Sequence, residues 1–176
     1  MKAIAPSKHV VLALVEDKPG VLHRVTSLIR RRGFNIDTIT VGATEVKGIS
    51  RITMTMMGDE KILEQVVKQL AKLIDVVKVS RLKPEAAVMR ELAMVKIHTP
   101  NTSVRADVMQ FVEIFRGHVV DASPESLTIE LSGDPEKIDA FLDIVKRYGI
   151  KELARTGAIA MQREKTSSSG SSKISV

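Results

Sequence analysis

Residues 49–82, "ISRITMTMMGDEKILEQVVKQLAKLIDVVKVSRL", change their hydrophobic period twice and therefore predict three successive elements. Apolar and polar residues alternate over 51–56, which is typical of a half-buried strand. A broad apolar stripe at helical spacing follows, and it predicts a helix that opens at Gly58 and Asp59. The final residues, "VVKVSRL", predict a second strand, so the order of this stretch is strand, helix, strand.

The residues before this stretch predict the same kinds of element. Residues 9–15, "HVVLALV", are apolar on both faces, as expected for a strand inside a sheet. A helix follows, because Pro19 lies near its first position and Gly33 just past its end. Next, "FNIDTITVGAT" predicts a strand that forms a hairpin with the one at 49, across the loop "EVKG". The order βαββαβ folds as a sheet with both helices on one face.

The second half of the chain repeats this order. Its predicted elements are a strand at 94–100, a helix at 104–115, a hairpin of "HVVDAS" and "SLTIELS" around Pro124, a helix at 134–149 capped by Asp134, and a closing strand "IKELART". Two local matches support an internal duplication. The stretch "RRGFNIDTI" aligns with "FRGHVVDAS", and "GDEKILEQVV" aligns with "GDPEKIDAFL".

The predicted fold class is therefore α+β, with two tandem ferredoxin-like βαββαβ domains that have antiparallel sheets and helices on one face. We assign residues 1–84 to the first domain and 85–164 to the second. Residues 165–176 are rich in Ser and have almost no hydrophobic anchors, which predicts a disordered tail.

The composition favours a cytoplasmic protein. The chain of 176 residues is 44% hydrophobic and 27% charged, and it has no cysteine for a disulfide, a thiolate metal site or a nucleophile. No apolar run is long enough to cross a bilayer, and the N-terminus lacks a signal-peptide core. The net charge is +6, but only 3% of the residues are aromatic, and the arginines at 30–32 complement the end of a helix. We expect neither nucleic acid nor membrane as a partner.

No catalytic or metal-binding set is evident. The four histidines have no spacing that suggests metal ligation, and Ser27 lacks the glycines of a nucleophile elbow. The acids of "DKP", "GDEK" and "GDPE" fit helix caps and first turns.

The turn at residues 15–22, "VEDKPGVL", is the best candidate for a binding site. It places the amide groups of Gly20, Val21 and Leu22 at a helix N-terminus, where they favour an anion. Asp17 is predicted to cap the helix and to accept hydrogen bonds from an ammonium group. Together these groups suit an α-amino acid, with apolar neighbours such as Leu14 to select its side chain. A capped turn without a ligand explains the same residues and remains the simpler interpretation of the motif alone.

Four longer segments of the sequence indicate more about what the turn binds. The segments "LVEDKPGVLHRVTSLIRRRGFNIDTITVG", "SRITMTMMGDEKILEQVVKQLAKLIDVVKVSRL", "RELAMVKI" and "EIFRGHVVDASPESLTIELSGDPEKIDAFLDIV" closely resemble the small, regulatory subunit of acetolactate synthase, from about residue 9 to residue 157. The resemblance implies an ACT domain that binds a branched-chain amino acid, usually valine, at a dimer interface. A second, ACT-like domain would help to hold the homodimer and to contact the large catalytic subunit.

The resemblance also implies a role in branched-chain amino acid biosynthesis. The chain would be no enzyme but would activate the catalytic subunit and confer feedback inhibition on it. It lacks the Gly-Asp-Gly segment of thiamine enzymes, so thiamine diphosphate, Mg and FAD are expected on the catalytic subunit and no cofactor on this chain. The alternative is a stand-alone ACT-domain amino-acid sensor that acts on another enzyme or on transcription, although no helix-turn-helix lies outside the repeats.

The effector-binding residues follow from the same resemblance. They are Asp17, Gly20, Val21, Leu22, Asn35, Ile36, Val41 and Gly42, of which Asn35 and Ile36 are expected from the neighbouring subunit. Asp17 departs from the family, because many relatives have Asn there. Ionised Asp only accepts hydrogen bonds, so it strengthens an ammonium contact but repels a nearby carboxylate.

Overall fold

The computed structural model describes residues 7–164, so the predicted disordered tail at 165–176 lies outside the described residues. The first half of the chain forms β1 (Ser7–Glu16), α1 (Val21–Arg31), β2 (Thr38–Ala43), β3 (Ile49–Gly58), α2 (Glu60–Leu70) and β4 (Val76–Leu82). After the short helix η1 (Pro84–Ala86), the second half forms β5 (Ala87–His98), α3 (Thr102–Ile114), β6 (His118–Ser123), β7 (Ser126–Gly133), α4 (Pro135–Val145), η2 (Lys146–Tyr148), β8 (Ile150–Arg155) and β9 (Ile159–Gln162).

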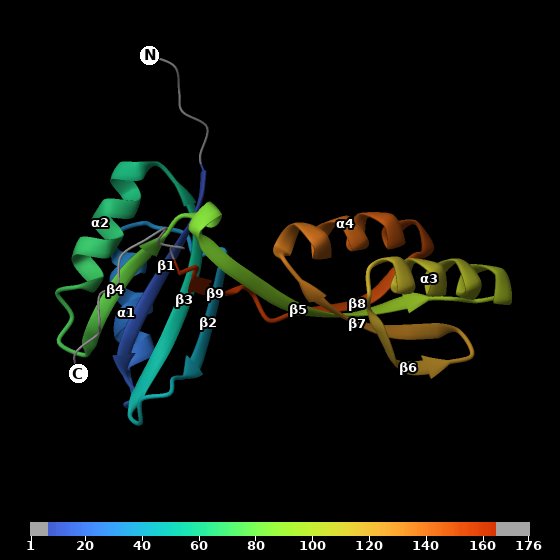
Figure 1. Ribbon diagram of the computed structural model, residues 1–176, viewed down its shortest axis with the longest axis horizontal. Coiled ribbons are helices and arrows are strands. Elements are labelled where there is room, and N and C mark those ends of the chain that lie inside the picture. The colour runs from blue at the N-terminus through green and yellow to red at the C-terminus, as the bar shows by residue number, and fades with distance from the viewer. Residues whose placement is uncertain (1–6, 165–176) are drawn as a thin grey trace, which may run out of the picture.

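The strand order confirms the predicted fold class. The first sheet has the order β2-β3-β1-β4 and the second has the order β6-β7-β5-β8, with antiparallel neighbours throughout. In each repeat the two helices lie on one face of the sheet (Figure 1). Within residues 7–164, none of the helices has the length and hydrophobicity that crossing a bilayer requires.

Each repeat buries its own core between its helices and one sheet face. The first core follows the predicted periodicity and contains Val11, Ala13, Val15, Val21, Val25, Ile29, Ile52, Met54, Met56, Leu63, Val66 and Leu70. In the second core Phe141 is fully buried, and Phe115 packs edge to face on it with ring centroids 5.4 Å apart. Each repeat therefore has a hydrophobic core of its own, as expected for two tandem domains.

The helix starts differ from the prediction in one important respect. The residue that caps α1 is Gly20, whose φ of 87° lies in the left-handed region, and within residues 7–164 no side chain caps this helix. The prediction that Asp17 caps α1 is wrong, because a capping side chain must lie directly before the first helical residue. Asp134 does occupy the cap position of α4, but its side chain makes no capping hydrogen bond.

An additional strand joins the two repeats. Residues 87–90 at the start of β5 pair with β9, and this ribbon lies against the first sheet although β9 follows the second repeat (Figure 1). Val10, Leu82, Ala87 and Ala160 form a small buried cluster between the ribbon and the sheet. The ribbon therefore covers part of the sheet face that points away from α1 and α2.

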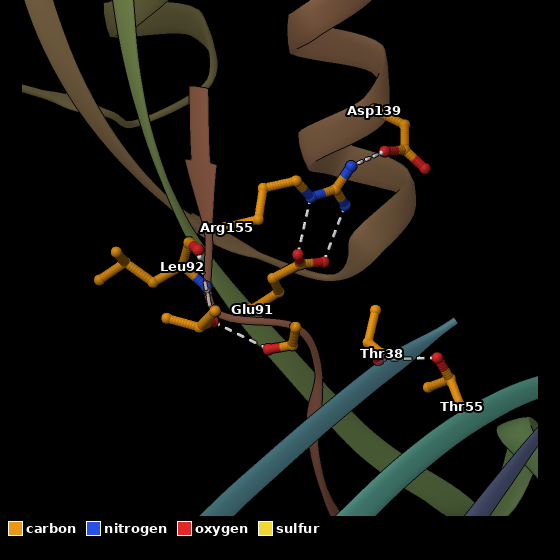
Figure 2. A network of polar contacts seen from close by, with 8 residues as sticks. Thr38, Thr55, Glu91, Leu92, Asp139 and Arg155 are labelled. Carbon is orange, nitrogen blue, oxygen red and sulfur yellow. Dashed lines mark hydrogen bonds and ion pairs between the residues drawn. The ribbon is translucent and has the colours of Figure 1, made fainter. Parts of the chain in front are cut away.

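Polar contacts within the second repeat hold the middle of β5 to β8 and α4, on the side of this repeat that faces the first (Figure 2). The Arg155 guanidinium donates to both carboxylate oxygens of Glu91 at 2.7 and 2.8 Å, and to Asp139 at 2.7 Å. Hydrogen bonding to Glu91 raises the pKa of Arg155 above its ordinary value. Next to it, the Thr156 amide donates to the Leu92 carbonyl at 3.0 Å. Since Glu91 is only 4% exposed, its ion pair with Arg155 is largely shielded from water.

Candidate functional site

The turn between β1 and α1 is tied to two other loops at the same end of the first sheet. The Glu16 amide donates to the Asp75 carbonyl at 2.9 Å, and the Asp17 amide donates to the Gly48 carbonyl at 2.8 Å. These bonds connect the turn to the loop before β4 and to the β2–β3 hairpin. The backbone of the turn is therefore held in place without any ligand.

A partly buried ion pair supports the turn from α1. The Arg24 guanidinium donates to both Asp75 carboxylate oxygens, at 2.7 and 2.9 Å. Asp75 is 7% exposed, so removal of Arg24 would leave a buried carboxylate without this partner. A Cβ atom at Gly20 would lie 3.6 Å from Arg24 Nη1, in addition to the strain of its positive φ. The sequence analysis missed this pair, and no local spacing signals two residues 51 positions apart.

The first turn of α1 presents unpaired donors. Within the described residues, the amides of Gly20 and Leu22 donate to no backbone carbonyl, whereas the Val21 amide donates to the Lys18 carbonyl at 3.3 Å. The Val21 side chain is buried in the core, so it cannot form a wall of a site at the turn. Free amides at a helix N-terminus favour an anion by about 0.3–1 kcal/mol when exposed.

An acid and an apolar side chain flank these donors. Asp17 is exposed, and within residues 7–164 its carboxylate has no hydrogen-bond or ion-pair partner. The adjacent Lys18 instead pairs with Glu16 at 2.8 Å, and this hydrogen bond raises the pKa of Lys18. Leu22 is 43% exposed beside the turn. The turn thus combines anion donors, a carboxylate acceptor and an apolar contact, which are the groups that a zwitterionic amino acid requires.

Val41 and Gly42 lie at the same end of the first sheet as the turn. Val41 is opposite Ile52, and Gly42 is opposite Arg51, which also pairs with Leu14 near the end of β1. Their strand, β2, is at the edge of the sheet, and Val41 is 49% exposed. An exposed apolar residue on an edge strand marks a surface that another chain can cover.

Asn35 and Ile36 are not brought to the turn. They follow α1, whose 11 residues span roughly 16 Å, so they lie at the other end of the helix from Gly20. Ile36 packs partly against the first core, and the Asn35 amide lies 3.5 Å from the Asp37 carboxylate. One chain therefore assembles the Asp17–Leu22 and Val41–Gly42 parts of the predicted site, without Asn35 and Ile36.

The corresponding turn of the second repeat is built differently. Asn101 caps α3 and its side chain accepts from the Val104 amide at 2.9 Å, which satisfies one donor that remains free in α1. The Thr99 hydroxyl is buried and has no partner within the described residues. In this part of the chain, no cluster of three or more His, Asp or Glu side chains is placed to hold a metal ion. The combination of free amides, an exposed acid and an apolar side chain, which suits an amino acid, is found at the turn of the first repeat.

Comparison with known proteins extends over both repeats. Residues 90–164 match the family described as "Small subunit of acetolactate synthase", and residues 11–78 match the "AHAS small subunit-like ACT domain". The chain is 56% identical to the "Probable acetolactate synthase small subunit" of Methanothermobacter thermautotrophicus, over 93% of this chain and 97% of that protein. It is 50% identical to the acetolactate synthase small subunit of Aquifex aeolicus, over 89% of this chain and 82% of that protein. The crystal structure of the acetolactate synthase small subunit from Thermotoga maritima is similar with a TM-score of 0.84 and 42% identity, over 91% of this chain and 99% of the other.

Proposed function

Because the chain belongs to the family of acetolactate synthase small subunits, we propose that it is a non-catalytic regulatory subunit in branched-chain amino acid biosynthesis. It associates with the large catalytic subunit, raises its activity and makes it sensitive to feedback inhibition by valine. The catalytic subunit carries thiamine diphosphate, Mg and FAD. The observation on which the proposal depends most is the β1–α1 turn, with its free amides and exposed acid on a backbone fixed by Arg24 and Asp75.

The turn suggests how valine binds. Its carboxylate accepts from the amides of Gly20 and Leu22, and its ammonium group donates to Asp17. Leu22 contributes apolar surface, and Gly20 lets the ligand approach the backbone. Asp17 must lie closer to the ammonium group than to the carboxylate, because two like charges in contact would weaken binding.

The second half of the site comes from another copy of the chain. Antiparallel pairing of two β2 edges places the start of one strand beside the end of the other. It brings Asn35 and Ile36 of the partner subunit toward Val41 and Gly42. The exposed edge of β2 supports this homodimer, since an edge strand that presents unpaired backbone groups is a template for such pairing.

Feedback then follows from linkage between binding and quaternary state. If valine binds one arrangement of the two repeats and the catalytic subunit more tightly than another, it shifts the population toward that arrangement. A coupling free energy of about 1–3 kcal/mol corresponds to about 5–150-fold modulation. The contact of β2 with the residues before β9, where Thr40 donates to the Ala158 carbonyl, is the element that couples the second repeat to the first.

Reconstitution tests the proposal. The purified chain is mixed with the catalytic subunit of the same organism, and acetolactate formation is measured with and without valine. We expect activation by the chain and inhibition by valine, and we expect Gly20→Asp to retain activation but lose inhibition. Gly149→Asp is the matched control, because Gly149 also has a positive φ, 92°, but lies in the second repeat.

Two results would contradict the proposal in different ways. If the chain neither binds the catalytic subunit nor raises its activity, the regulatory role itself is rejected. Valine inhibition that persists unchanged in Gly20→Asp would place the effector elsewhere, with the regulatory role intact.

A further inference from the structure

A row of side chains on the outer face of the first sheet, away from α1 and α2, forms a second polar region. The strand register aligns Gly42, Arg51, Leu14 and Lys78 across the four strands. The β5–β9 ribbon covers the neighbouring rows, where Thr40 donates to the Ala158 carbonyl at 3.0 Å and Gly157 packs against Thr38. The aligned row thus lies at the border of the ribbon, on the sheet face opposite α1.

Arg51 is the half-buried cation of this row. Its side chain is half-buried, and within residues 7–164 it makes neither an ion pair nor a hydrogen bond. The nearby Lys78 is exposed and is likewise unpaired in this part of the chain. A guanidinium that is partly removed from water without an anion is a costly arrangement, and a bound carboxylate would relieve it.

A threonine next to Arg51 adds a second polar group. Thr53 lies two residues after Arg51 on the same face of β3 and is only 2% exposed. Among the described residues its hydroxyl has no hydrogen-bond partner, and Thr53 lines a hollow that Arg51 also borders. The hydroxyl is therefore available to a ligand in that hollow.

The shape and lining of the space define the ligand class. Arg51 borders two hollows of about 330 and 260 Å³, and Met161 of β9 also lines both. Apolar atoms of Leu12, Leu14 and Met161 line the second hollow. Glu45 is the one acid among the described residues that line the two hollows, and it lies in the larger. The region offers a cation, a hydroxyl and apolar walls, but little to bind an ammonium group.

We propose that Arg51 and Thr53 bind the carboxylate of a small aliphatic acid beneath β9, in a hollow that Val41 and Gly42 also line but that includes no residue of the turn at 15–22. The guanidinium forms a two-point contact with the carboxylate, and the Thr53 hydroxyl donates a third hydrogen bond. The aliphatic part of the ligand packs against Leu14 and Met161. Since β9 follows the second repeat, a ligand here touches both repeats and favours the arrangement in which the ribbon covers the sheet.

Methyl NMR of the full-length chain tests this site with 3-methylbutanoate, which has no ammonium group. The chain is labelled at its methionine methyl groups, so that Met161 reports on the site and the exposed Met109 on α3 reports on unrelated changes. We expect a saturable shift of the Met161 signal alone. Arg51→Met should weaken binding by about ten-fold or more, and Thr53→Val by about three-fold or more.

Controls separate this site from the effector turn. Lys47→Met removes one positive charge from the exposed β2–β3 loop and should leave the affinity unchanged, as should Gly20→Asp, which alters the turn. Absence of a saturable shift, or an unchanged affinity in a folded Arg51→Met variant, would overturn the proposal. Tighter binding of inorganic phosphate than of 3-methylbutanoate would also overturn it, because the apolar walls would then contribute nothing.

Discussion

Arg24 and Asp75 lie 51 positions apart in the chain, and their side chains meet in a two-point ion pair behind the β1–α1 turn. The Asp75 side chain is 10% exposed and that of Arg24 is 48% exposed, so the acid depends on the pair more than the arginine does. The Asp75 carbonyl also accepts the amide of Glu16. A single residue therefore holds both ends of the turn that we propose as the effector site.

Removing the arginine should loosen the turn and destabilise the first repeat. Arg24→Met leaves the Asp75 carboxylate buried without its partner, which should lower the free energy of unfolding by about 1–3 kcal/mol. Valine affinity should fall as well, because the amides of Gly20 and Leu22 are no longer held in one geometry. Urea denaturation and calorimetric titration measure the two effects. Lys68→Met, which breaks the exposed pair with Glu64, should change stability by less than about 0.5 kcal/mol. Equal effects of the two variants would show that Asp75 needs no partner.

The edge of β2 should form the homodimer. Val41→Lys places a charge on an exposed edge position and should shift the chain from dimer toward monomer, because a charged side chain on an edge strand disfavours strand pairing between copies. Analytical ultracentrifugation across a concentration series measures the shift. Met109→Lys changes an exposed apolar residue of α3 in the same way and should leave the association constant unaltered. A dimer of unchanged strength in Val41→Lys would place the interface on another surface.

The stability of the second repeat should depend on Glu91 far more than on Asp139. Both acids bind Arg155, but the Glu91 side chain is 3% exposed and that of Asp139 is 57% exposed. Glu91→Gln should lower the free energy of unfolding by about 1–3 kcal/mol, and Asp139→Asn by less than about 1 kcal/mol. Urea denaturation provides the comparison, and small-angle scattering should show a broader distribution of dimensions for Glu91→Gln alone. A larger effect of Asp139→Asn would contradict this ranking.

Thr99 should be replaceable by an apolar residue of the same shape. Its hydroxyl is buried without a partner in the described residues, so Thr99→Val should raise the free energy of unfolding by about 1 kcal/mol. Thr99→Ser keeps the hydroxyl and removes the methyl group, so it should be less stable than the parent. Thermal unfolding of the three proteins measures the order. A destabilised Thr99→Val would show that the hydroxyl finds a hydrogen-bond partner in solution.

The repeated βαββαβ order could be predicted because it depends on local periodicity. Alternation over 51–56 and the helical stripe of α2 each act within a few residues, and they correctly predicted β3 and α2. The four-residue strand β9 was missed because its exposed Ile159 and Met161 alternate with alanines, a pattern too short to stand out. Its partner segment at 87–90 was likewise missed, because each segment becomes a strand only by pairing with the other, and they are far apart in the sequence.

The candidate site could be predicted in part for the same reason. The Pro19–Gly20 pair marks a turn into a helix by local chemistry, and the structure places that turn at the start of α1. The capping role of Asp17 was wrong because the left-handed Gly20 starts the helix without a side-chain cap. The support from Arg24 and Asp75, and the unpaired Arg51 under β9, follow from tertiary contacts that no spacing in the sequence encodes.

Calorimetric titration of valine into the purified chain, beside Gly20→Asp and Gly149→Asp, shows whether the β1–α1 turn binds the effector. We expect saturable heat for the parent and for Gly149→Asp, and none for a folded Gly20→Asp variant. Saturable heat of the same affinity in all three proteins would contradict this expectation, because the β1–α1 turn would then not bind the effector.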